Sequence, residues 1–408
     1  MIFQKQLNRL AVFCVFLAAA AAAASGVMAC RAEEAGDVTF TDAAGRFLDA
    51  VLVIDCSGSL DLPETGTDPE KLALEAAGLF TDMAEAEKTR IGIVAFSDRI
   101  EKNMPLTAIT SEEDRGHVRE AVRSLDYDYT GDTDLGEAAR AAVQMLCSGE
   151  ENTEADEPGE MDAETQRART ILFFTDGWID LPHASDPQAA EEASEKKLRE
   201  ALQRSLDEDI RVYTIMLGDD AASFDPVFAG SRIFHIGEAQ ELPAVYMDIF
   251  AELIGARPVS DGIEDIVIRE PGSSAGTDFS IPPAPEGSIE EANVILISRK
   301  PISEITVYDS GGALLKPQVS LSEHYSLVKL RKPEGGTYHL DVSGQEPCTV
   351  NVNLLLNSSV TLRCSVEDGE NREAARVAAW LEHGGERVTD PQICGAFRVT
   401  AHITDPEG

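Results

Sequence analysis

The most informative segment of the chain is Ala50-Val51-Leu52-Val53-Ile54-Asp55-Cys56-Ser57-Gly58-Ser59. Its five leading apolar residues are typical of a strand that is buried on both faces of a parallel sheet. A carboxylate and two hydroxyls, on Asp55, Ser57 and Ser59, follow at the carboxyl end of that strand, where α/β sheets bind ligands. Gly58 lets the backbone turn tightly, so the three side chains can converge on one point. Oxygen ligands suit a hard divalent cation.

On either side of this segment, short β-branched runs alternate with longer amphipathic segments, which is typical of parallel strands joined by crossover helices. The pattern begins near Phe47 and predicts further strands at 90–96, 170–174, 210–216 and 233–236. Helices are expected at 69–86, 111–124, 135–147, 187–207 and 242–254. Residues 148–166 contain eight acidic side chains and almost nothing apolar. We expect an exposed loop there, with no spacing that indicates a Ca²⁺ loop.

The composition changes after Arg257-Pro258 to proline, glycine and serine, followed by short β-rich runs and no long amphipathic helix. These runs, at 293–297, 304–308, 325–330, 337–342 and 349–355, predict an antiparallel sandwich. The expected division is an α/β domain at 46–257, a β-sandwich-like domain at 258–356 and a second β-rich segment at 357–408. The chain ends on turn residues with no strand after them, so the completeness of the last segment stays open.

Residues 1–29 have the features of an export signal, with Lys5 and Arg9 before an apolar stretch from Leu10 to Ala24 and small residues up to Ala29. A linker at 30–45 would follow. Three outcomes stay open: simple cleavage near Ala29, lipidation of Cys30 in a lipobox-like context, or retention of the segment as a membrane anchor. Each places the protein outside the cell or at the cell envelope.

The overall charge limits the choice of partners. The chain has 34 basic and 73 acidic residues, a formal net charge of −39, which would repel the phosphate backbone of nucleic acids. Seven cysteines show no CxxC pair or Cys/His spacing suited to zinc. Cys348, Cys364 and Cys394 could supply one disulfide in an exported chain, but the sequence does not say which pair.

Three separated elements together resemble the von Willebrand factor A-type family and its metal-ion-dependent adhesion site. They are Asp55-x-Ser57-x-Ser59, the threonine of Gly131-Asp132-Thr133-Asp134-Leu135-Gly136, and the aspartate of Phe174-Thr175-Asp176-Gly177. The resemblance covers about residues 47–255 and implies a doubly wound, mostly parallel sheet flanked by helices. It also implies that Asp55, Ser57, Ser59, Thr133 and Asp176 hold Mg²⁺ or Mn²⁺, on which one position accepts a carboxylate from a protein or peptide ligand.

Residues 332–344 resemble a strand of the immunoglobulin-like domains that follow A-type domains, although a turn that leads into an amphipathic strand explains the same residues. Trp178, close to Asp176, either contacts a ligand or lines a loop. Cys56 is expected to be a small buried filler, because a catalytic thiol needs a basic partner and none is near in sequence.

Two other functions compete with metal-dependent adhesion. A haloacid dehalogenase-like phosphotransferase would need a second aspartate two residues after Asp55, where Ser57 stands, and no common hydrolase or nucleotide motif occurs. We therefore expect no enzymatic activity. A structural or assembly scaffold of the cell envelope, in which the metal only stabilises the fold, fits the same residues.

Overall fold

The computed structural model describes residues 15–17, 28–30, 47–62, 65–127, 132–148, 167–218, 226–256, 262–368, 375–396 and 399–401. Most of the expected export signal, nearly all of the linker, the acidic segment at 149–166 and the last seven residues lie outside these ranges. Those predictions, and the division into domains, stay predictions.

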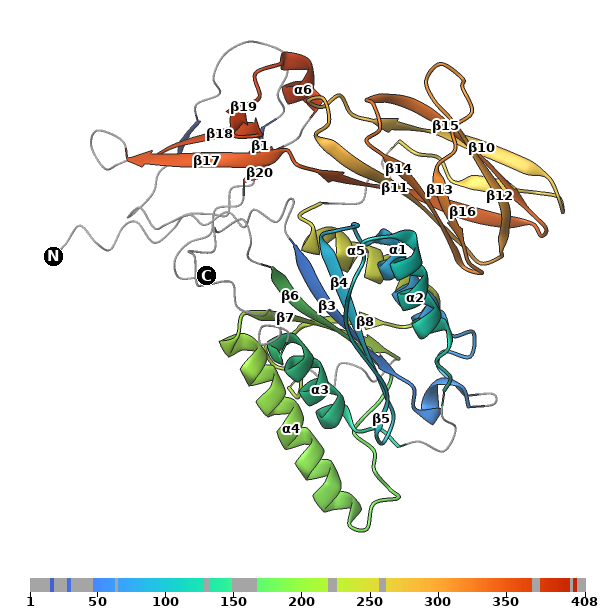
Figure 1. Ribbon diagram of the computed structural model, residues 1–408, viewed down its shortest axis with the longest axis vertical. Coiled ribbons are helices and arrows are strands. Elements are labelled where there is room, and N and C mark those ends of the chain that lie inside the picture. Colours follow the sequence, from blue (N-terminus) through green and yellow to red (C-terminus); the bar gives the residue numbers. More distant parts are fainter. Residues whose placement is uncertain are drawn as a thin grey trace.

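A six-stranded sheet forms the centre of the first half of the chain (Figure 1). Its spatial order is β5-β4-β3-β6-β7-β8, and every neighbouring pair is parallel except β4 with β5. The bounds are β3 (Leu48–Asp55), β4 (Thr89–Phe96), β5 (Ile100–Ala108), β6 (Ala168–Thr175), β7 (Ile210–Leu217) and β8 (Arg232–Ile236). All of β3 is buried, as its apolar run predicts.

Helices cover both faces of this sheet, so the predicted doubly wound α/β fold is confirmed (Figure 1). One face packs against α1 (Leu72–Met83), α2 (Glu112–Arg123) and α5 (Leu242–Leu253), and the other against α3 (Leu135–Ser148) and α4 (Pro187–Asp207). Side-chain caps fix two helix starts: Ser111 accepts from the backbone N–H of Asp114, and Asp186 from that of Ala189.

The second half of the chain is β-rich, as expected, and contains two antiparallel sheets with a common apolar core. The three-stranded sheet consists of β10 (Ser274–Ile281), β15 (Gly336–Gly344) and β12 (Ile302–Tyr308). The five-stranded sheet consists, in spatial order, of β13 (Gln318–Leu321), β14 (Tyr325–Arg331), β11 (Ile289–Ser298), β16 (Cys348–Ser358) and β9 (Ile266–Ile268).

The outer face of the five-stranded sheet packs against α1, so the two halves share one apolar cluster. Ile295, Tyr325, Leu327 and Leu355 from this sheet belong to the same buried cluster as α1 and α5. This explains why β14 is buried along six of its seven residues, whereas β15 on the other sheet alternates between buried and more exposed positions.

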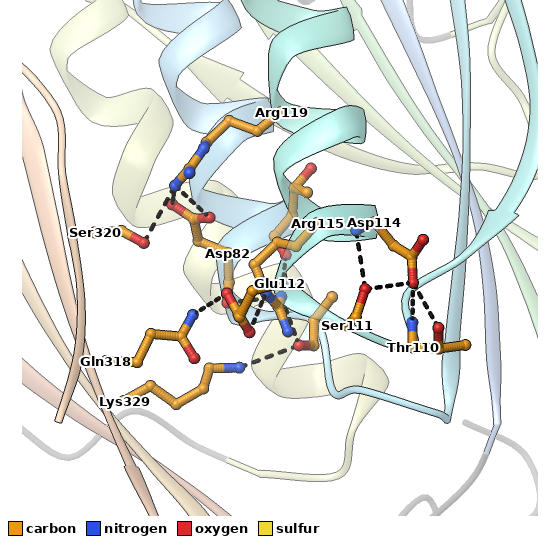
Figure 2. A network of polar contacts seen from close by, with 12 residues as sticks. Asp82, Thr110, Ser111, Glu112, Asp114, Arg115, Arg119, Gln318, Ser320 and Lys329 are labelled. Carbon is orange, nitrogen blue, oxygen red and sulfur yellow. Dashed lines mark hydrogen bonds and ion pairs between the residues drawn. The ribbon is translucent and has the colours of Figure 1, made fainter.

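Polar contacts also link α1 and α2 to the five-stranded sheet (Figure 2). Lys329 is fully buried, where its ammonium donates to the carbonyl of Ala84 at 3.1 Å and to Glu291 at 2.9 Å. Arg115 donates to the carbonyls of Thr81, Asp82 and Ala84 at 2.6, 3.1 and 2.9 Å. These two cations therefore satisfy carbonyls at the carboxyl end of α1 that have no partner within the helix.

A four-stranded sheet of β17 (Thr361–Asp368), β18 (Ala375–His383), β19 (Glu386–Arg387) and β2 (Met28–Cys30) follows the sandwich. The remaining elements are α6 (Pro391–Ala396), which is not predicted by the sequence pattern, and β1 (Val15–Leu17) paired with β20 (Val399–Ala401). Within the described ranges, no helix combines the length and the apolar character needed to cross a bilayer. Cys348, Cys364 and Cys394 are free thiols.

Candidate metal site

The candidate site lies where β3 and β6 run side by side at the centre of the sheet. From β3 the chain continues outward to β4 and β5, and from β6 it continues in the opposite direction to β7 and β8. The carboxyl ends of two such strands leave a crevice between their loops. Asp55 is the last residue of β3, and Asp176 directly follows β6.

Asp55 is fully buried, and local hydrogen bonds fix both of its carboxylate oxygens. The backbone N–H of Ser57 donates to Oδ1 at 2.8 Å, and the hydroxyl of Thr175 donates to Oδ2 at 2.6 Å. Thr175 is the last residue of β6, so this second bond joins the ends of the two central strands.

The two serines connect Asp55 to Asp176. The Oγ atoms of Ser57 and Ser59 lie 3.2 Å apart, and Ser59 Oγ donates to Asp176 Oδ1 at 2.7 Å. The hydroxyl of Thr67 donates to the other oxygen of Asp176. The structure therefore brings together four of the five residues that the sequence predicts, and the two serines lie in a turn that contains the short 3-10 helix η1 (Gly58–Leu60).

Thr133, the fifth predicted residue, is buried just before α3. Its backbone pairs with Asp180, with N–H to carbonyl distances of 2.7 and 3.1 Å, which attaches the Thr133 segment to the loop that follows Asp176. Its neighbour Asp132 accepts from the backbone N–H of His183 at 3.1 Å. Thr133 thus belongs to the same edge of the sheet, where its backbone lies beside Asp180.

Burial and mutual repulsion make the negative charge of this site costly. Desolvation by burial, followed by the charge of Asp176, raises the pKa of Asp55 to about 7. Burial also raises the pKa of Asp176. The hydrogen-bond partners of both carboxylates among the described residues are neutral hydroxyl and N–H groups. Two carboxylates and nearby hydroxyls without a basic partner are a donor set that fits a hard divalent cation.

Three further residues support the site without having been assigned to it from sequence. Thr67 and Thr175 each bind one of the two aspartates. Asp68 is buried, accepts from the backbone N–H groups of Leu72 and Ala73 at 2.7 and 2.9 Å, and accepts from the hydroxyl of Tyr127 at 2.6 Å. It therefore anchors the start of α1 directly after Thr67. The role of Thr175 could have been inferred from the sequence, because this residue lies within the Thr175-Asp176-Gly177 motif.

The site opens to solvent on the side of Ser59, which is exposed, whereas Asp55 and Ser57 are buried. Trp178 is 52% exposed and Leu62 is 42% exposed, and they lie two residues after Asp176 and three residues after Ser59. Cys56, between Asp55 and Ser57, is buried in the core, and burial raises the pKa of its thiol. A buried neutral thiol is a packing group and not a nucleophile.

The fold and the site thus define an α/β domain with an acidic, oxygen-lined site at the point where its strand order reverses. The model of the von Willebrand factor type A domain family matches residues 50–178, so this part of the chain is similar to that domain. The match includes Asp55, Ser57, Ser59, Thr133 and Asp176. A comparison with curated proteins gives no match.

Several solved structures are similar in fold. Proximal thread matrix protein 1 from the mussel byssus has 12% identity and a TM-score of 0.37, with 56% of this chain and 50% of that chain covered. The pilus adhesin SpaC from Lactobacillus rhamnosus GG has 10% identity and a TM-score of 0.39, with 88% and 51% covered. The vWF domain of the type V pili tip protein Mfa5 from Porphyromonas gingivalis has 13% identity and a TM-score of 0.38, with 52% and 97% covered. The chain spans about half the length of the first two.

Proposed function

We propose that this protein binds a protein or peptide ligand through a divalent cation, Mg²⁺ or Mn²⁺. The observation that carries the proposal is the pair of carboxylates, Asp55 and Asp176, held by neutral donors at the end of the two central strands. In this proposal the ion is held by Asp55, Ser57, Ser59, Thr133 and Asp176.

Such an ion would keep enough positive charge to attract a further anionic ligand. Only two of its protein ligands are carboxylates, whereas the serine and threonine ligands are neutral, so the ion stays electrophilic. Water reaches the site beside the exposed Ser59. A carboxylate of the partner can then complete the coordination. The chain's net charge of −39 opposes an acidic partner at long range, but salt screens that repulsion beyond about 8 Å.

The surface beside the ion would select the partner. Trp178 and Leu62 are exposed apolar side chains close in sequence to the site residues, and exposed tryptophan is a frequent anchor of protein interfaces. We further propose that the protein acts outside the cell or at the cell envelope, through the export features of residues 1–29, and that it is not an enzyme.

Isothermal titration of Mg²⁺ and Mn²⁺ into the chelator-treated full chain tests the site. We expect one saturable binding event that the Asp55→Ala/Asp176→Ala variant loses. Asp49→Asn is the matched control, because Asp49 is buried on the same strand, where it is paired with Arg90 and Arg167. It should keep the binding.

The result also separates adhesion from a scaffold role. If the folded wild-type protein binds neither ion, the metal-dependent mechanism is wrong. If the metal raises the melting temperature but no partner is captured in a metal-dependent way, the ion stabilises the fold and the scaffold interpretation gains support.

A further inference from the structure

A second group of potential metal ligands lies between the α/β half and the sandwich. Glu75 comes from the first turn of α1, whereas Glu323 and His324 form the turn between β13 and β14. One potential ligand atom from each of these three residues lies within 4.8 Å of the other two. Almost 250 residues separate Glu75 from the other two, and the packing of the five-stranded sheet on α1 brings them together.

Close contacts hold this histidine against the helix. The backbone N–H of His324 donates to Glu75 Oε2 at 2.9 Å. Its Nδ1 atom lies 3.5 Å from the same carboxylate oxygen, and its Nε2 atom lies 3.6 Å from an oxygen of Glu70. The imidazole is therefore fixed with a carboxylate beside each ring nitrogen.

The inner nitrogen of this ring has only the long 3.5 Å contact with Glu75 and no close hydrogen bond. Nδ1 of His324 is buried and has no hydrogen-bond partner within the described part of the chain. A buried polar atom without a partner costs about 1–3 kcal/mol, so native structures usually satisfy it with a protein group, a water or an ion. The side chains of His324 and Glu75 are only 14% and 16% exposed, whereas Glu323 is exposed and leaves a path to solvent.

The local surplus of negative charge also favours a bound cation. Three carboxylates, on Glu70, Glu75 and Glu323, gather around this one imidazole. Lys71, the nearest basic residue along α1, is engaged in an ion pair with Asp126. A cation would offset the excess negative charge and give Nδ1 a partner.

We propose that Glu75, Glu323 and His324 bind a Zn²⁺ ion that links the sandwich to the first turn of α1. Imidazole nitrogen and carboxylate oxygen atoms are both zinc ligands, and three protein ligands leave the fourth position to water. Nδ1 of His324 binds the ion, and Nε2–H donates to Glu70, which fixes the orientation of the ring. Tetrahedral bonds of about 2.0–2.1 Å require the ligand atoms to move closer together, and the exposed Glu323 side chain is free to do so.

This site is chemically distinct from the one at Asp55. Imidazole favours zinc and similar transition metals, whereas a donor set made only of oxygen atoms favours Mg²⁺. The two sites are also made by different residues, so the proposal stands whether or not the function proposed above is correct.

Titration of Zn²⁺ into the chelator-treated full chain, with Mg²⁺ in excess throughout, tests the proposal. Wild type and the Asp55→Ala/Asp176→Ala variant should each bind one Zn²⁺ ion. His324→Gln and Glu323→Gln should each weaken that binding by at least about tenfold. Glu323 is exposed, so its variant should fold even if substitution of the partly buried histidine disturbs the interface.

His339→Gln is the matched control, because this histidine also lies between two carboxylates, 2.6 Å from Asp278 and 3.3 Å from Asp341, but on the other sheet. It should bind Zn²⁺ as wild type does. Co²⁺ provides a second readout, since visible absorption of a tetrahedral complex should appear in wild type and be absent from Glu323→Gln. Equal Zn²⁺ affinity in the His324 and His339 variants, or no binding to folded wild type, would overturn the proposal.

Discussion

Replacing Asp55 with asparagine should stabilise the metal-free protein while removing its affinity for Mg²⁺. The ionised side chain is fully buried beside Asp176, which raises its pKa from 3.8 to about 7. One pKa unit corresponds to about 1.4 kcal/mol, so ionisation of Asp55 at pH 8 costs the folded state up to about 4 kcal/mol. Asparagine has nearly the same shape and cannot ionise.

The hydrogen bonds of Asp55 can survive this substitution. The amide oxygen can still accept from the backbone N–H of Ser57, and the amide nitrogen can donate to the hydroxyl of Thr175, which is able to accept as well as donate. We therefore expect the free energy of unfolding in chelator at pH 8 to rise by about 1–4 kcal/mol.

The dependence on pH has a defined sign. Between about pH 4 and pH 7 the folded protein keeps a proton on Asp55 that the unfolded chain has lost, so metal-free wild type should lose stability as the pH rises through this window. The Asp55→Asn variant should lose less. With saturating Mg²⁺ the order should reverse, because only wild type gains stability from the ion.

Urea denaturation in chelator and in Mg²⁺, at pH 5 and pH 8, measures these effects. Asp82→Asn is the control, because Asp82 is equally buried but paired with Arg119 and with the hydroxyl of Tyr325. It should destabilise the protein under every condition. If Asp55→Asn lowers the free energy of unfolding in chelator as Asp82→Asn does, the charge of Asp55 does not destabilise the metal-free protein. The electrostatic argument for the site is then refuted.

Three other substitutions test separate parts of the structure. Lys329→Met leaves the buried Glu291 without its cation and should lower the free energy of unfolding by about 3–5 kcal/mol. Adding Glu291→Gln should recover part of this loss, and urea denaturation measures both variants. Gly136→Ala would place a Cβ atom 2.1 Å from the carbonyl oxygen of Ser194, so α3 and α4 must separate and calorimetry should show a lower melting temperature. Thr133→Ala should weaken Mg²⁺ binding in titration calorimetry by about tenfold, with an unchanged melting temperature, because its backbone pairing does not need the side chain.

Most of the α/β fold was predictable because its central strands can be recognised from their own sequences. Strands such as β3 and β6 are buried on both faces and therefore contain continuous apolar runs, Ala50–Ile54 and Ile171–Phe174. The edge strand β5 was not predicted, because it lies antiparallel at the border of the sheet and has a half-exposed sequence that mixes polar and apolar residues and contains Pro105. The start of α1 was also placed too early, since Lys71 has a positive φ of 56° and the helix begins only at Leu72.

The candidate metal site was predictable to the extent that its residues lie at strand ends. Asp55 and Asp176 directly end or follow buried strands, so their proximity followed from the topology. Thr67 lies on a loop, and no periodic pattern indicates that its hydroxyl would reach Asp176. The group of Glu75, Glu323 and His324 was beyond sequence reasoning, because it depends on how two separately recognisable halves pack together.

Helix α1 joins both regions of interest, and its two ends are held in different ways. Its start follows Asp68 and Thr67, which are bound to the loops of the candidate metal site. Its far end is capped by the buried ammonium of Lys329 and by Arg115, at 2.6–3.4 Å. A shift of the helix along its axis by one residue, about 1.5 Å, would stretch these bonds beyond hydrogen-bonding distance and leave a buried cation unsatisfied. The sandwich therefore opposes axial movement of α1, so that adjustment to the proposed ion would fall to the turn from Ser57 to Leu62, where the exposed Ser59 lies.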